Sequence, residues 1–106
     1  MIEVLTVHGF GSFFKGALNP GDVDLLLLHR STEAKSCRFA IQCKRQLQAA
    51  LPGAHIVMLS EAEATSHCFL GQADTVQLCT VHEDKIESDI DAVIVAIRMR
   101  RGSSRD

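Results

Sequence analysis

Residues 21–29, with the sequence GDVDLLLLH, place two aspartates directly before four leucines. The continuous apolar run from Val23 to His29, interrupted only by its aspartate, predicts a central strand that is covered on both faces. Residues two apart in a strand project from the same face, so Asp22 and Asp24 would direct both carboxylates to one point where the strand begins. Mg²⁺ prefers oxygen ligands and commonly bridges carboxylates to substrate phosphates. The stretch therefore predicts a buried strand with a magnesium site at its start.

A second polar motif, Gly11-Ser12, follows the alternating residues 3–8, which predict an earlier strand. A glycine at a strand end lets the backbone approach a ligand, and Ser12 at the start of a short helical turn would offer its hydroxyl and free amides to an anion. Taken alone, Gly11-Ser12 is a simple turn, and Asp22 is a turn residue. Because the two motifs lie ten residues apart beside two apolar strands, together they favour a site for a metal-bound triphosphate. The chain has neither a G-x-G-x-x-G motif nor a Walker A loop.

After the leucine run, a helix is predicted from a cap at Ser31 or Thr32 to the turn at Pro52-Gly53. Its apolar residues are spaced to form one stripe: Cys37, Ala40, Ile41, Leu47 and Leu51. Such a stripe predicts that the helix packs against the sheet.

Two further strands are predicted at residues 55–59 and 75–81. Between them, Ser60 and Glu63 have the capping-box spacing, which predicts a short helix to about Leu70. The chain thus predicts an α/β (α+β) fold, in which a small mixed sheet of about four strands is backed by helices.

The last predicted helix, from Asp84 to about Arg100, contains a second Asp-x-Asp motif. Its apolar residues have helical spacing: Ile86, Ile90, Val93, Ile94 and Ile97. On a helix, Asp89 and Asp91 point about 200° apart and cannot share a ligand. We therefore expect both on the solvated face of the helix.

The composition predicts one globular domain over residues 1–100 with a flexible basic tail at 101–106, since 46% of the 106 residues are apolar and 23% are charged. A formal net charge of −2 gives no general attraction to nucleic acid, so we do not expect a nucleic-acid partner. The longest apolar run, Leu25 to Leu28, is far shorter than the roughly 20 residues of a membrane span.

The opening residues Met-Ile-Glu-Val show no secretion signal, which predicts a cytoplasmic protein whose four cysteines are reduced. The cysteines form no C-x-x-C pair and have no zinc-site spacing, so we expect them to be small buried side chains.

The combined motif, Gly11-Ser12, Lys15-Gly16 and Gly21-Asp22-Val23-Asp24-Leu25-Leu26, resembles the active site of the nucleotidyltransferase superfamily related to DNA polymerase beta, in its minimal single-domain form. The resemblance extends more loosely to about Leu78. It implies that Asp22 and Asp24 hold Mg²⁺ ions, and that Gly11, Ser12 and Lys15 belong to the nucleotide site. It also implies transfer of a nucleotidyl group from an NTP to a hydroxyl, with release of pyrophosphate.

Two departures from the family pattern change what we expect. His55 stands where the family has a third carboxylate, which predicts a weakened second metal site that favours Mn²⁺ over Mg²⁺. An alternative is that His55 only begins a strand, and that Glu61 or Glu63 supplies the carboxylate. The helix that precedes the first strand in the family has no counterpart here, so we expect a small helical partner protein or a second copy to cover apolar surface.

Three classes of function are compatible with these motifs. The first is a nucleotidyltransferase that modifies a small molecule or a protein hydroxyl. The second is a catalytically impaired nucleotide-binding partner or antitoxin-like regulatory module, and the third is a structural domain in which the Asp-x-Asp motif is incidental.

Overall fold

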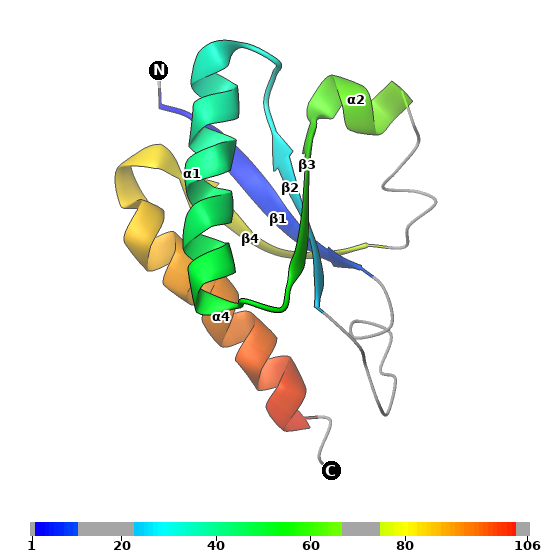
Figure 1. Cartoon of the computed structure of the whole chain (residues 1–106), viewed down its shortest axis with the longest axis vertical. Coiled ribbons are helices and arrows are strands. Elements are labelled where there is room, and N and C mark those ends of the chain that lie inside the picture. Colours follow the sequence, from blue (N-terminus) through cyan, green and yellow to red (C-terminus); the bar gives the residue numbers. More distant parts are fainter. Residues whose placement is uncertain (1, 11–22, 67–74, 104–106) are drawn as a thin grey trace.

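The computed structural model describes residues 2–10, 23–66 and 75–103, which form a four-stranded mixed sheet with helices (Figure 1). The strands are β1 (Val4–Phe10), β2 (Asp24–His29), β3 (His55–Ser60) and β4 (Val76–His82). The helices are α1 (Ala34–Ala50), α2 (Glu61–Ser66) and α4 (Ile86–Ser103), with a 3-10 turn, η2 (Glu83–Lys85), before α4. The predicted fold class is confirmed. Helix α4 extends past its expected end at about Arg100, to Ser103.

The strand order is β3-β2-β1-β4. β1 is antiparallel to both of its neighbours, and β2 is parallel to β3, to which α1 connects it. Because β2 and β3 are parallel, they begin at the same edge of the sheet, where Asp24 is paired with His55. β1 also joins segments that are far apart in the sequence, since Val4 is paired with His82.

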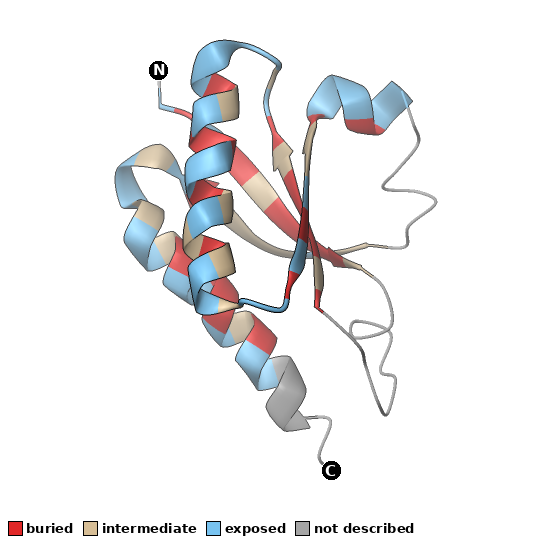
Figure 2. Cartoon of the chain, viewed as in Figure 1, coloured by how far each residue is buried: buried red, intermediate tan, exposed pale blue. Residues whose placement is uncertain are grey.

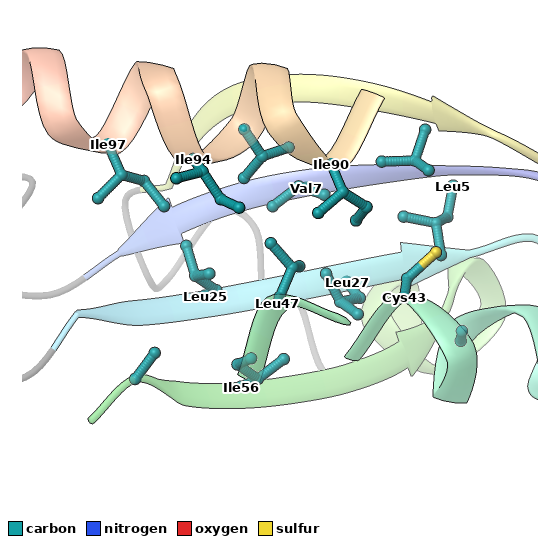
Figure 3. Packing of buried hydrophobic residues seen from close by; sticks show 14 of the residues in the cluster. Leu5, Val7, Leu25, Leu27, Cys43, Leu47, Ile56, Ile90, Ile94 and Ile97 are labelled. Carbon is teal, nitrogen blue, oxygen red and sulfur yellow. The ribbon is translucent and has the colours of Figure 1, made fainter. Parts of the chain in front are cut away.

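α1 and α4 cover one face of the sheet, and the core lies between them and the strands (Figure 2). Figure 3 shows Leu25 and Leu27 of β2 pointing toward residues of both helices. Leu26 belongs to the opposite face, yet all three leucines are 0% exposed. Full burial stabilises the fold by about 1.5–3 kcal/mol per leucine side chain. The prediction of a central strand covered on both faces is therefore confirmed for Leu25 to Leu27.

The apolar stripe of α1 differs from the predicted one. The buried residues of the helix are Ser36, Phe39, Ala40, Cys43 and Leu47. Ile41, which we expected to be buried, is 39% exposed. Residues 36, 40, 43 and 47 define the centre of the buried side of the helix. Because successive residues are rotated by about 100° about the helix axis, position 41 falls outside that side. On α4, four of the five predicted apolar residues are buried, Ile90, Val93, Ile94 and Ile97, while Ile86 at the start of the helix is only partly buried.

The ends of the helices confirm one predicted cap and correct another. The Ser60 N–H donates to Glu63 Oε1 (2.9 Å), and the Glu63 N–H donates to Ser60 Oγ (3.1 Å), so the capping box at α2 is present. The N-cap of α1 is Glu33, with no side-chain cap bond, so the predicted cap at Ser31 or Thr32 is wrong. Ser31 instead accepts the Glu33 N–H in the preceding turn, at 3.2 Å.

Asp89 is not simply solvated as predicted, whereas Asp91 is exposed. Asp89 Oδ2 accepts the backbone N–H of His82 at 2.9 Å and lies 3.0 Å from His82 Nδ1. These hydrogen bonds from His82 lower the pKa of Asp89. The carboxylate thereby ties the end of β4 to the first turn of α4.

Candidate functional site

The first residues of β2 and β3 form the candidate site. Asp24 begins β2, and its side chain is 27% exposed. Because Leu25 points into the core under α1 and α4, alternation along the strand places Asp24 on the opposite face of the sheet. The site therefore lies on the sheet face opposite α1 and α4.

His55 begins β3 beside Asp24, in register with it. Its Nδ1 lies 3.4 Å from Asp24 Oδ1, and its side chain is 68% exposed. The His55 N–H donates to Val23 O at 2.8 Å, which aligns the two strands at this point. The position that the family pattern gives to a third carboxylate thus lies directly beside Asp24, on the adjacent strand.

The other predicted site residues lie outside the described residues: Gly11, Ser12, Lys15 and Asp22. The described residues that flank this part of the chain are Phe10 and Val23. Phe10 is paired with Asp24, and Val23 accepts the His55 hydrogen bond. The chain therefore leaves β1 and enters β2 at the same sheet edge, beside the Asp24–His55 pair.

His8 is a further residue of the same face, although its sequence context contains no ligand motif. It is paired with Leu26, one step along β2 from Asp24 on this face, and it is buried. Burial lowers the pKa of His8, so the imidazole is neutral at neutral pH, and its Nε2 lies 2.8 Å from Thr6 Oγ1. The antiparallel register of β1 and β2 brings it here, and the sequence does not show that register.

The two glutamates offered as alternatives to His55 lie elsewhere. Glu61 and Glu63 belong to α2, which follows the far end of β3, and Glu63 is engaged in the capping box. In the described part of the chain, His55 is thus the side chain placed beside Asp24, and neither glutamate replaces it there.

The donor atoms at this point are carboxylate oxygen and imidazole nitrogen. Mg²⁺ prefers oxygen alone, whereas Mn²⁺, Zn²⁺ and related ions also accept imidazole nitrogen. Among residues 2–10, 23–66 and 75–103, no group of three or more His, Cys, Asp or Glu side chains is arranged to hold a metal. Asp24 and His55 place one carboxylate and one imidazole side by side, and the sequence predicts Asp22 as a further ligand.

Comparisons of the chain with protein-family models, with curated proteins and with solved structures found no match. In the described residues, no helix has the length and apolar character needed to cross a membrane.

Proposed function

We propose that the protein is a nucleotidyltransferase-like domain that binds a metal–NTP complex where β2 and β3 begin. The observation that carries the proposal is the in-register pairing of Asp24 with His55, whose Nδ1 lies 3.4 Å from Asp24 Oδ1 on the sheet face opposite α1 and α4. Both side chains are on strands whose backbones are fixed by neighbouring strands, as a site that must position metal and phosphate requires.

In the proposed site, Asp24 and Asp22 hold the metal ions, while Gly11, Ser12 and Lys15 contact the nucleotide phosphates. These last roles rest on the motif resemblance. In the reaction, the acceptor hydroxyl oxygen forms a bond to the α-phosphorus of the NTP. The bond between that phosphorus and pyrophosphate breaks, and the hydroxyl proton is released. The acceptor is a small molecule or a protein side chain.

His55 determines which metal serves this site. An imidazole gives one nitrogen and no negative charge in its neutral form, so it replaces a carboxylate poorly beside Mg²⁺. NTP binding through the aspartates survives this change, but transfer is slow with Mg²⁺ and faster with Mn²⁺.

The same observation favours a second function, that of a nucleotide-binding regulatory or antitoxin-like module with impaired catalysis. A histidine beside Asp24 would weaken the binding of the ion that activates the acceptor more than the binding of the ion that the nucleotide brings with it. A cytoplasmic location is part of both proposals, because NTPs and reduced thiols are found there.

Calorimetry of Mn²⁺-ATP binding, followed by transfer of label from α-³²P-ATP, tests the proposal. Asp24→Asn should weaken binding by at least about a hundredfold, more than the roughly 10–100-fold cost of losing an outer-shell partner. Glu33→Gln removes an exposed carboxylate at the N-cap of α1 and is the matched control, expected to bind like the parent.

Equal binding by the parent and Asp24→Asn would refute the metal site. Binding in the parent without label transfer to any acceptor, with either metal, would favour the regulatory module over the enzyme.

A further inference from the structure

The outer side of the helical layer carries two stripes of opposite charge. On α1, Arg38 and Arg45 are exposed, while on η2 and α4 the exposed acidic residues are Asp84, Glu87 and Asp91. Figure 2 shows the outward sides of both helices as exposed and their inward sides as buried. Within the described residues, no ion pair involves any of these five side chains.

Each stripe also contains an exposed aliphatic residue. Ile41 lies between Arg38 and Arg45 at helical spacing, and it is 39% exposed. Val95 continues the row of Glu87 and Asp91, four residues further on, and is 52% exposed. Each stripe thus combines its charged residues with one exposed aliphatic side chain.

The two stripes are neighbours on one surface. α1 and α4 pack side by side and run in the same direction (Figure 1). A groove between them is lined by Gln42 and Gln46 of α1 and by Lys85, Glu87 and Asp91 of the η2–α4 segment. The helical layer therefore presents the basic stripe of α1 beside a groove whose η2–α4 side carries the acidic residues and Lys85.

We propose that this face binds a second copy of the chain, related by a two-fold axis that runs along the helices. That operation places α1 of each copy on α4 of the other, so each basic stripe meets an acidic one. A partner with charges of one sign would be repelled by one of the two stripes. A second copy satisfies both, because it carries both.

This dimer is independent of the nucleotide proposal. The Asp24–His55 pair lies on the opposite face of the sheet from α1 and α4, so both sites of the dimer remain accessible. Failure of dimerisation and failure of nucleotide binding would therefore be separate results.

Sedimentation velocity of the full chain over a range of salt concentrations tests the interface. We expect a dimer at low ionic strength that weakens as salt rises, because screening shortens the Debye length to roughly 10 Å at 0.1 M. Arg38→Glu/Arg45→Glu makes both stripes acidic, and Glu87→Lys/Asp91→Lys makes both basic. Each should raise the dimer dissociation constant by at least about a hundredfold.

An equimolar mixture of the two charge-reversed proteins provides the decisive measurement. Each helix then faces one of opposite charge, so a heterodimer should form with about parental affinity although neither variant associates alone. Glu61→Lys, on α2 and away from this face, is the control and should dimerise like the parent.

Circular dichroism tests whether each variant is folded. If one is not, Arg38→Gln/Arg45→Gln takes its place, and a smaller loss of dimer affinity is then expected. A parent that is monomeric at every salt concentration would overturn the proposal. So would a charge-reversed variant that dimerises as tightly as the parent, or a mixture that yields no heterodimer.

Discussion

The molecule contains two aspartate–histidine pairs that differ in their hydrogen bonds to the backbone and in their exposure. Asp89 lies 3.0 Å from His82 Nδ1 and also accepts the His82 backbone N–H, so its carboxylate is used within the fold. Asp24 lies 3.4 Å from His55 Nδ1, and that imidazole is largely exposed. The same two residue types thus form a structural tie in one place and a pair accessible to a ligand in the other. Local hydrogen-bonding context distinguishes the two pairs.

The replacement His55→Asp sharpens this comparison most. It adds a carboxylate beside Asp24 and should strengthen Mg²⁺ binding by about tenfold, because attraction between a carboxylate and a cation at 4 Å is worth about 1 kcal/mol per unit charge even in water. Calorimetry with Mg²⁺-ATP measures the change. His82→Asp is the matched variant at the other pair and should leave Mg²⁺ affinity unaltered. If His55→Asp gains neither affinity nor transfer activity, His55 does not occupy the third ligand position.

The replacement Asp89→Asn tests the structural role of the other pair. The variant keeps the shape of the side chain but loses the charge that strengthens the hydrogen bonds from His82, so Tm should fall by a few degrees while nucleotide binding stays at the parental level. Asp24→Asn should instead weaken nucleotide binding and leave Tm nearly unchanged, since an exposed pair of this kind contributes little to stability. Thermal unfolding followed by circular dichroism distinguishes them. Equal Tm losses in the two variants would mean that both pairs are structural.

The smallest expected effect is the pH dependence of the Asp89 contribution. Its pKa in the folded protein is lowered, so its stabilising effect is present above the ordinary aspartate pKa of about 3.9 and is lost as the pH falls through the lowered value. The Tm difference between the parent and Asp89→Asn should therefore be largest near neutral pH and shrink below about pH 4. His8, whose pKa is lowered by burial, also costs stability on acidification, but it is present in both proteins and cancels. A Tm difference that grows toward low pH would contradict this assignment.

The sequence was sufficient to predict the strands and helices where the apolar period was unambiguous. The leucine run of β2, the isoleucine spacing of α4 and the capping box at Ser60 each rest on local rules, and each is confirmed. Local rules failed where two neighbouring residues fit the same apolar pattern. Ile41 fits a hydrophobic pattern as well as its neighbour Ala40 does, and only packing against the sheet decides which is buried.

The candidate site was predictable in part, for a related reason. The family resemblance gave His55 the third ligand position, and the parallel pairing of β3 with β2 is what brings it beside Asp24. The role of Asp89 was not predictable, because its contact with His82 depends on the turn η2 between β4 and α4. The placement of His8 on the site's face depends on a strand register that no local pattern encodes.

The pairing of β1 with β4 has a consequence for biosynthesis. β1 leaves the ribosome before β4, so its β4 edge stays open until the chain through His82 has been made. In the meantime β1 presents free backbone groups next to apolar side chains, a combination that promotes association between nascent chains. Prematurely terminated chains that lack β4 and α4 should therefore aggregate or be degraded, whereas loss of residues after Ser103 should leave synthesis productive.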